Sequence, residues 1–525
     1  MSLDDRVIVV GAGPAGLTMA AELARNGVRS RVLDRAAAPA TDSRAIAIHA
    51  RTLEAFASMG FVERVLAAGQ RIHGANLFAD GRRILHFSLD ELPSPYPFAL
   101  DLPQRETERI LLEHLRGFGI EVERRAAVTG VSQDADGVRL HVQRAGGAVE
   151  TLETEYVVGC DGANSLVRQA VGIPFEGSSA EETFLLADVA IEQDEPDDEW
   201  RFWFHEDGLL SAMPLPGGLH RLVADYDGPT PTFETLRRIF SERGPKSARL
   251  GEPAWFAPFR LSRRTAPQYQ RGRVFVAGDA AHVQNPAGGQ GMNTGVQDAF
   301  NLAWKLSMVL RGTAPETLLE SYTAERQPVA RSMLSLTANL ASIATLRHPV
   351  SQGIRNRVIP ILAGFEVLEH RIVERFAELS VNYRTSPIVD QHGRWTAGPL
   401  PGDRAPALYS LLRGSRHVAL LFTGENPDKD DLRGFANIAR YMRDGYPDEV
   451  TTHLIARRTA LWDGPSIADP DGHAHHAYSA GVPCVYLVRP DGYIGFRSLT
   501  ADPLPLLEHL NRVYEPPMAV DAAVS

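Results

Sequence analysis

The hydrophobic pattern at the start of the chain predicts two strands joined by a helix. Arg6–Val10 is a short β-branched run that ends in glycines, as buried parallel strands do. Residues 14–26 then place apolar side chains on one helical face, and Gly27 follows as the stop. Ser30–Asp34 is a second apolar strand. The chain therefore opens with a βαβ unit.

Beyond this unit the pattern changes twice. Residues 182–266 are strand-rich with turn pairs such as Asp227-Gly228, which predicts an antiparallel sheet. Strand-then-helix character returns afterwards, so we expect the sheet to be inserted into a discontinuous first domain. The other predicted strands are Val138–Val142, Glu155–Cys160 and Arg273–Val276, and the predicted helices are Glu106–Phe118 and Thr294–Leu310.

The hydrophobic pattern also predicts a separate unit in the last third of the chain. Residues 317–379 are mostly helical, and Pro399–Asp403 marks a linker. Apolar strands at His417–Phe422 and Cys484–Val488 indicate a small α/β domain. We therefore divide the chain into a first domain of residues 1–70, 97–181 and 267–345, a sheet domain of 71–96 and 182–266, a helical connection of 346–398 and a third domain of 399–515.

The composition and charge of the chain argue against several classes of function. The 525 residues carry 54 basic and 65 acidic side chains, a net charge of −11 that argues against nucleic acid as a partner. The two cysteines, Cys160 and Cys484, form no CxxC pair, so we expect neither disulfides nor a cysteine metal site and favour the cytoplasm. The chain shows no signal-peptide pattern and no apolar run of about 18–20 residues, so no membrane association is expected.

The first chemical motif is Gly11-Ala12-Gly13-Pro14-Ala15-Gly16 between the first strand and the helix. Its glycines permit a tight turn and the close approach of a pyrophosphate, which the helix N-terminus attracts. Asp34, at the end of the second strand, can bind an adenosine ribose hydroxyl. We add Ala15 and Arg35 to this predicted nucleotide contact set. The alternative is a glycine-rich turn with no ligand.

Two later segments separate FAD from NAD as the ligand. Residues 157–168 read VVGCDGANSLVR, and residues 273–293 read RVFVAGDAAHVQNPAGGQGMN. Together with the first motif they resemble the group A flavoprotein monooxygenases, the family of para-hydroxybenzoate hydroxylase, phenol hydroxylase and the polyketide aromatic hydroxylases. The resemblance spans Arg6 to Leu310 with the motifs in the family's order.

The family resemblance implies a fold and an activity. The fold is α/β, with a Rossmann-like FAD domain, an inserted mixed or antiparallel substrate sheet and a C-terminal thioredoxin-like domain. The activity is hydroxylation of a phenolic or polycyclic aromatic substrate, using non-covalent FAD, NADPH or NADH, and O2 through a flavin C4a-hydroperoxide. A halogenase or reductase of the same fold, or a flavin-bound sensor without turnover, are the alternatives.

The same resemblance implies cofactor-binding residues. Asp279 would bind the ribityl chain of FAD, and Gln104 would reach the same chain. Asp161 is associated with both FAD and the nicotinamide, its alternative being a turn aspartate that caps the next helix. Arg44 would contact a phosphate of FAD or NADPH, or is a plain solvated arginine.

The stretch from Pro286 to Asn293 leads into a helix and is predicted to form the flavin edge. Its glycines let backbone N–H groups approach a flat ring, and the helix N-terminus stabilises negative charge there. Pro286 would lie over the flavin carbon that receives oxygen, as in the family. The residues we assign to this edge are Pro286, Gly289, Gly291, Met292 and Asn293.

The substrate pocket is less defined by the sequence. We expect it between the flavin and the inserted sheet, lined by Ile46, Ala47, Phe202, Phe204, Met213 and Pro286. His205 is a candidate base, against the alternative of a structural histidine. No metal is expected, since His473, His475 and His476 lack ligand spacing.

The thioredoxin-like tail is expected to be structural or dimer-forming. It lacks CxxC, which excludes dithiol redox chemistry, and all flavin motifs lie before Arg311. We therefore expect an FAD-binding core that survives removal of the residues after Leu400. The sequence leaves open the substrate's identity and ring size, the regiochemistry, NADPH versus NADH, the base, the oligomeric state and the metabolic role.

Overall fold

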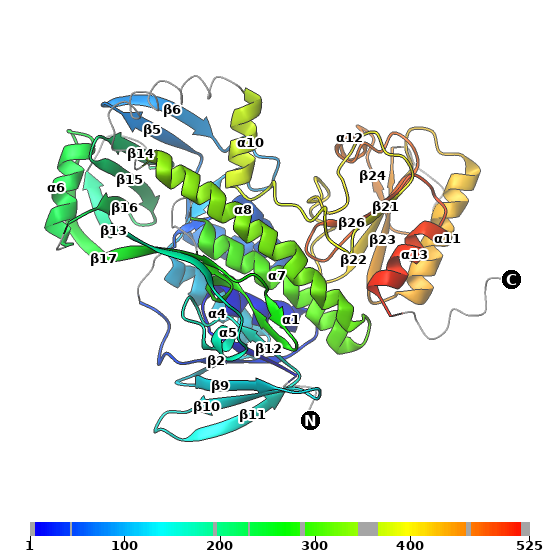
Figure 1. The fold of residues 1–525 in the computed structure, drawn as a ribbon. Helices are drawn as coiled ribbons and strands as arrows, with labels where there is room; N and C mark the ends of the chain where they lie inside the picture. Colours follow the sequence, from blue (N-terminus) through cyan, green and yellow to red (C-terminus); the bar gives the residue numbers. More distant parts are fainter. Residues whose placement is uncertain are drawn as a thin grey trace.

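The computed structural model describes residues 6–41, 45–192, 197–228, 231–283, 289–344, 366–457 and 464–515. The described residues form five sheets. Figure 1 shows two long helices, α7 and α8, that run between the largest sheet and the C-terminal sheet. Among the described residues no helix is long and apolar enough to span a membrane. The fold is mixed α/β, as the sequence predicted.

The first domain is built on a six-stranded sheet in the order β18-β19-β12-β1-β2-β8. Strand β1 (Val7–Val10) is buried throughout and lies parallel to both β2 and β12, which explains its uniformly apolar sequence. The other strands are β2 (Ser30–Asp34), β8 (Val122–Arg124), β12 (Tyr156–Gly159), β18 (Gln270–Arg271) and β19 (Val274–Val276).

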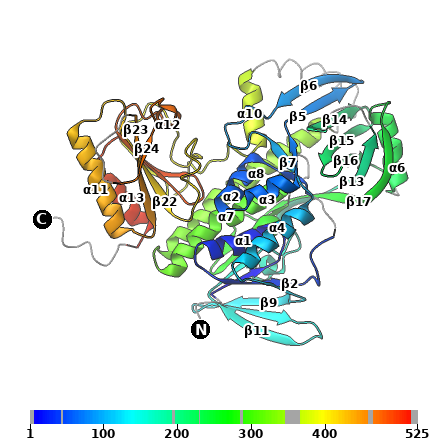
Figure 2. The same cartoon turned by 180° about the vertical axis from the view of Figure 1, so that it is seen from behind.

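Helices and two small sheets complete this domain (Figure 2). A three-stranded sheet of order β3-β7-β4 consists of β3 (Ala47–Ile48), β7 (Ala99–Asp101) and β4 (Gln70–Ile72). A second one, β11-β10-β9, consists of β9 (Ala127–Gln133), β10 (Val138–Gln143) and β11 (Val149–Thr154). The helices are α1 (Pro14–Arg25), α2 (Ala50–Met59), α3 (Val62–Ala68), α4 (Gln104–Gly117), α5 (Leu166–Ala170) and α7 (Gln290–Arg311), with short turns η2 (Gly278–Ala280) and η3 (Glu316–Leu319).

The largest sheet has eight strands in the order β20-β17-β13-β16-β15-β14-β5-β6. Because β5 pairs with β14, segments 71–96 and 182–266 share this sheet. Its strands are β5 (Gly74–Ala79), β6 (Arg82–Ser88), β13 (Glu176–Glu192), β14 (Glu199–His205), β15 (Gly208–Leu215), β16 (Leu219–Tyr226), β17 (Arg249–Thr265) and β20 (His282–Val283).

One helix in this region was not expected from the sequence. Helix α6 (Phe233–Arg243) begins at Thr232, whose side chain accepts a hydrogen bond from the backbone N–H of Thr235. Its apolar residues Leu236, Ile239 and Phe240 cover one face of the large sheet. The sequence prediction missed this short amphipathic helix because strands precede and follow it. The helix has an ordinary threonine N-cap and one buried apolar face.

The C-terminal part is a six-stranded sheet of order β21-β26-β25-β22-β23-β24. Strands β22 (His417–Phe422) and β25 (Cys484–Val488) match the predicted boundaries, whereas β21 (Asp390–His392) lies within the segment expected to be a helical connection. The other elements of this part are β23 (Val450–Ala456), β24 (Ser466–Ala468), β26 (Ile494–Ser498), α11 (Lys429–Gly445), α12 (His473–Ala477) and α13 (Leu504–Val513). Helices α8 (Glu320–Ala344) and α10 (Glu366–Phe376) precede it in the chain, and α10 lies beside β6 of the large sheet (Figure 1). The thioredoxin-like assignment of this part stays a prediction.

The C-terminal sheet shares a core with the long helix α7. Trp304 and Met308 of α7 belong to the same buried cluster as Leu421 and Leu487 of the sheet. Beside them, the guanidinium of Arg489 binds both carboxylate oxygens of Glu325 on α8. Truncation after Leu400 would expose this core and leave Glu325 without that partner, so we expect it to cost stability. That an FAD-binding core survives the truncation stays a prediction.

Candidate active site

The turn after β1 shows which of its glycines the chain itself requires. Gly11 has φ +104°, and a Cβ there would lie 2.3 Å from the carbonyl oxygen of Cys160. A Cβ at Gly16 would lie 1.9 Å from the carbonyl oxygen of Gly11. Gly13 differs, because a Cβ there would meet nothing within 4 Å. Gly13 is also the N-cap of α1 and makes no side-chain cap, so the first N–H groups of the helix are available to a ligand.

Asp34 lies beside this turn with its carboxylate already engaged. One oxygen accepts a hydrogen bond from the backbone N–H of Ala12 at 2.8 Å, and the other from that of Ala36 at 2.7 Å. Arg124 of β8 lies 3.5 Å away as an ion-pair partner. Each carboxylate oxygen has a second lone pair, so Asp34 can still accept from a ribose. Its neighbour Arg35 is exposed.

Gln104 is the first residue of α4 and is joined to the segment after residue 44. Its backbone N–H donates to the carbonyl of Ala45 at 3.0 Å, and its side-chain amide donates to Glu108 at 2.8 Å. Burial raises the pKa of Glu108, and the nearby Arg124 acts in the opposite direction. Sequence reasoning missed Glu108 and Arg124; the spacing of Gln104 and Glu108 on one helical face was the available signal.

The two acidic motif residues at the strand ends differ in their surroundings. Asp161 accepts hydrogen bonds from the backbone N–H groups of Leu166 and Val167 at 2.7 and 3.1 Å. It therefore fills the helix-capping role that the sequence offered as the alternative, and its cofactor contact stays a prediction. Asp279 lies in η2 and is exposed to solvent.

The N-terminus of α7 is held against the strand that contains Ala47. Gly289 is its N-cap with φ +64°, and a Cβ there would lie 2.7 Å from Cβ of Ala47. Asn293 donates to the carbonyls of Ala47 and Gly289 at 2.8 and 2.7 Å and accepts from the backbone N–H of His49 at 2.9 Å. Gly291 and the buried Met292 lie in the same first turn. Pro286 and Arg44 lie outside the described residues.

These observations test whether the residues fit FAD. Both α1 and α7 begin at a glycine without a side-chain cap, and both are long enough to carry a helix dipole. The start of α1 is open where a pyrophosphate would approach, and the start of α7 offers a second set of N–H groups. The arrangement fits a dinucleotide that carries negative charge near two separate points.

A row of side chains crosses the face of the large sheet opposite α6. Met213 of β15 pairs with Arg221 of β16, which pairs with Asp188 of β13, which pairs with Trp255 of β17. Cross-strand partners share a face, so these side chains form one line. Trp200 of β14 extends the line, because its neighbour Arg201 pairs with the residue before Met213.

We call Trp200, Met213, Arg221, Asp188 and Trp255 the sheet row. Arg221 is buried, binds Asp188 and lies 4.8 Å from the centre of the Trp255 ring. The indole N–H of Trp200 donates to the carboxylate of Asp101 on β7 at 2.7 Å. That hydrogen bond joins the row to the small sheet that contains Ala47.

The predicted pocket residues separate into two groups. Ala47, Phe202 and Met213 belong to one apolar cluster with Trp200. Ile46 is buried next to Ala47, with its carbonyl accepting from the backbone N–H of Leu102. Phe204 lies two residues beyond Phe202 and is absent from that cluster as the structure describes it.

His205, the candidate base, ends strand β14 at a hairpin tip. It lies five residues beyond Trp200, about 16 Å along the strand. Its nearest ion-pair partner is Asp207 at 3.4 Å. His205, Glu206 and Asp207 together are the one set of side chains among the described residues that could hold a metal ion. Exposed acidic groups of this kind are common without a metal ion. The distance along the strand places His205 away from the apolar cluster that contains Trp200.

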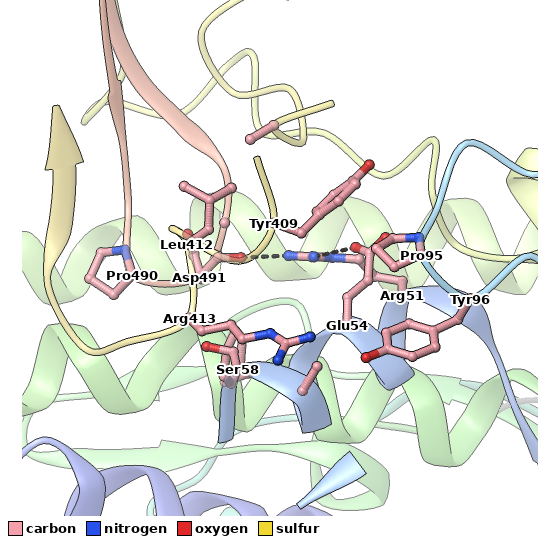
Figure 3. Close-up of a pocket in the computed structure, with 14 residues that line it drawn as sticks. Arg51, Glu54, Ser58, Pro95, Tyr96, Tyr409, Leu412, Arg413, Pro490 and Asp491 are labelled. Carbon is pink, nitrogen blue, oxygen red and sulfur yellow. Dashed lines mark hydrogen bonds and ion pairs between the residues drawn. The ribbon is translucent and has the colours of Figure 1, made fainter. Parts of the chain in front are cut away.

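Figure 3 shows a cavity between the first domain and the C-terminal sheet. Arg51 spans it, donating to Glu54 at 2.8 Å and to the backbone carbonyl of Asp491. The cavity has a volume of about 40 Å³, which has room for a few water molecules and not for an aromatic ring. It is therefore an interdomain contact and not the substrate site.

Comparison with known proteins defines the class of enzyme. The family model described as "FAD binding domain" matches residues 4–337, and the chain belongs to this family of FAD-dependent aromatic monooxygenases. It is a flavin-dependent monooxygenase, as the sequence predicted, and the halogenase, reductase and sensor alternatives gain no support.

Particular relatives extend over most of the chain. The 6-methylpretetramide 4-monooxygenase of Streptomyces rimosus is 37% identical over 514 residues, covering 93% of this chain and 90% of that protein. The pentachlorophenol 4-monooxygenase of Sphingobium chlorophenolicum is 35% identical and covers 80% of each chain. The structure of aklavinone-11 hydroxylase with FAD and aklavinone has a TM-score of 0.79 at 25% identity, covering 98% of this chain and 99% of that one.

Proposed function

We propose that this enzyme hydroxylates a phenolic or polycyclic aromatic compound with NAD(P)H and O2. The observation that carries the proposal is the sheet row, which is joined through Asp101 to the strand packed on the start of α7. A flat ring between that helix and the row would meet aromatic, aliphatic and cationic side chains. The relatives named for pentachlorophenol, 6-methylpretetramide and aklavinone support the same substrate class.

The cofactor assignments follow from the two helix starts. In this proposal the pyrophosphate of FAD lies at Gly13, with Gly11, Ala15 and Gly16 forming the turn and Asp34 binding the adenosine ribose. Asp279 and Gln104 bind the ribityl chain. The first turn of α7 meets the charged edge of the flavin through the backbone of Gly289, Gly291, Met292 and Asn293. Arg35, Arg44, Asp161 and Pro286 keep the roles that the family resemblance implies.

FAD would supply the reducing equivalents drawn from NAD(P)H and the activated oxygen. The chain's own residues then have three tasks. The apolar cluster of Ala47 with the partly buried Phe202 and Met213 excludes water from the reacting ring. The first turn of α7, tied down by Asn293, gives a fixed positive potential. The sheet row orients the substrate ring.

Two further assignments belong to the same proposal. The flavin domain comprises residues 1–70, 97–181 and 267–345, and the substrate sheet 71–96 and 182–266. Residues 399–515 form a thioredoxin-like domain without CxxC. This domain packs on α7 and, in our proposal, also joins two copies of the chain into a homodimer. Light scattering of the purified holoenzyme tests the homodimer.

A substrate screen tests the function. The holoenzyme is mixed with NADPH or NADH and a panel of simple phenols and polycyclic phenols, and product is analysed after turnover under ¹⁸O2. We expect one class of compound to accelerate NAD(P)H oxidation and to acquire one labelled oxygen atom. Oxidation that yields hydrogen peroxide alone with every compound would contradict the proposal.

A further inference from the structure

Asp101 is a buried carboxyl group that the cofactor assignments do not use. It is the last residue of β7, the middle strand of the three-stranded sheet, and lies opposite Ala47 on one side and Gln70 on the other. It is fully buried. One oxygen accepts the indole N–H of Trp200, and the other, Oδ1, has no hydrogen-bond partner.

A buried carboxyl oxygen without a hydrogen-bond partner lowers the stability of the fold, so its presence needs an explanation. No cation pairs with Asp101 directly among the described residues. Arg221 acts on it from a distance, since its own guanidinium is bound to Asp188. From β3 the next titratable group is His49, whose ring lies 6.3 Å from that of Trp200, and β4 offers the neutral Gln70.

These surroundings favour the neutral acid at neutral pH. Burial raises the pKa of Asp101 to about 8, while the hydrogen bond from Trp200 and the charge of Arg221 act in the opposite direction. A group with this pKa can take up a proton at a moderately alkaline pH and release it again.

The position of Asp101 matches the proposed substrate site. Its partner Ala47 lies against Gly289 at the start of α7, and its partner Trp200 begins the sheet row. Opposite residues of an antiparallel pair are separated by about 5 Å, so Asp101 lies within about 10 Å of the flavin-edge helix. Asp101 therefore lies between the start of α7 and the sheet row, the two features on either side of the place where the proposed function puts the substrate ring.

We propose that Asp101 is the catalytic base that receives the phenolic proton of the substrate. The O–H bond of the phenol breaks, the new O–H bond forms at Oδ1, and the electron pair stays on the phenolic oxygen, which makes the ring more nucleophilic. This inference rests on the proposed function. It restricts the substrate to compounds with a free ring hydroxyl.

The main test uses D101N, since an asparagine keeps the shape and can still accept the indole N–H of Trp200. With the phenol identified in the screen, product formation should fall about 100-fold or more, and the alkaline rise in rate should disappear. FAD content should be unchanged. The methyl ether of the same phenol should react equally slowly with both enzymes. D207N at the exposed hairpin tip is the matched control and should behave as the wild type.

A second variant, W200F, tests Asp101 by a pH shift that a purely structural role of Asp101 would not produce. Removing the indole donor takes away an interaction that lowers the pKa of Asp101, so the alkaline rise should move to higher pH. If D101N fails to retain FAD, this shift decides the question.

The outcomes separate the two proposals. Labelled product from the wild type with an unchanged rate and pH profile in D101N would overturn the role of Asp101 and leave the function standing. A pH profile of W200F that coincides with the wild type would overturn it as well. Absence of labelled product from every phenol would remove the proposed function, and the base with it.

Discussion

Replacing Arg489 with methionine should detach the C-terminal sheet from the two long helices. Arg489 donates to the two oxygens of Glu325 at 2.6 and 2.9 Å and to Asp491 at 3.0 Å. Lys305 of α7 donates to Glu325 at 2.7 Å. The side chains of these residues are at most 2% exposed. Methionine fills a similar volume and removes only the charge and its hydrogen bonds.

The expected loss follows from charge balance. The wild-type cluster holds two cations and two carboxylates, whereas the variant leaves two carboxylates with Lys305 alone. Removing one partner of a buried ion pair costs about 3–5 kcal/mol. Arg489 and Lys305 together hold the pKa of Glu325 well below its usual range, so that carboxylate stays charged when Arg489 is lost. A loss of about 3 kcal/mol lowers the docked fraction relative to the undocked one by roughly two powers of ten.

Hydrogen exchange of the holoenzyme measures this loss at the interface. The amides of β25 and β26 should exchange at least tenfold faster in R489M, and limited proteolysis should cleave near residue 399. R433M is the control, because Arg433 pairs with Asp430 on the surface with side chains 72% and 83% exposed, and such pairs are worth less than about 1 kcal/mol. If R489M matches R433M in exchange and proteolysis, the reasoning about the buried cluster is wrong.

Four other predictions can each be checked by measurement. Gly11→Ala should fail to fold, because its Cβ meets the Cys160 carbonyl at 2.3 Å, whereas Gly13→Ala should fold but purify with less FAD; visible absorbance and thermal unfolding distinguish the two. Asp279→Ala should give folded protein that is largely colourless, and full flavin content would contradict its assignment. Flavin bleaching by NAD(P)H without oxygen should be at least tenfold faster with the phenol than without it, which needs about 1.4 kcal/mol of differential binding; equal rates in stopped flow would argue against gating. Burial lowers the pKa of His509 from 6.5 to about 3, so the fold holds the neutral ring and loses stability as pH falls below 6.5; in His509→Phe, acid unfolding curves should lose part of that dependence.

The local elements of the nucleotide end could be predicted because they are encoded by short-range patterns. Strand β2 and the start of α1 match their predicted boundaries, and so do β22 and β25 in the C-terminal sheet. Gly11 and Gly16 have a purely steric signature, which any strand-turn-helix junction of this kind requires. The α/β fold class followed from the alternation of strands and helices, and the flavin chemistry from the resemblance of the motifs to the group A flavoprotein monooxygenases.

The substrate side could not be predicted in the same way, since it depends on contacts between distant strands. Asp101 and Trp200 are 99 positions apart, and neither the periodicity of β7 nor that of β14 indicates that they meet. The aromatic run that contains Phe202 was visible, but which face of the sheet it occupies is fixed by its register with β5 and β15. The burial of Glu325 and Arg489 was invisible for the same reason.

Helix α7 links two events that are usually studied separately. Its 22 residues span about 33 Å, with Gly289 and Asn293 at the end facing the proposed flavin edge and Trp304 and Met308 in the core of the C-terminal sheet. Any order that a cofactor imposes on the first end is shared with the second, and the coupling acts equally in both directions. A substitution far out in the C-terminal sheet would then present as flavin deficiency. Variants of that sheet that purify pale should be refolded with excess FAD before their loss of activity is ascribed to the chemistry.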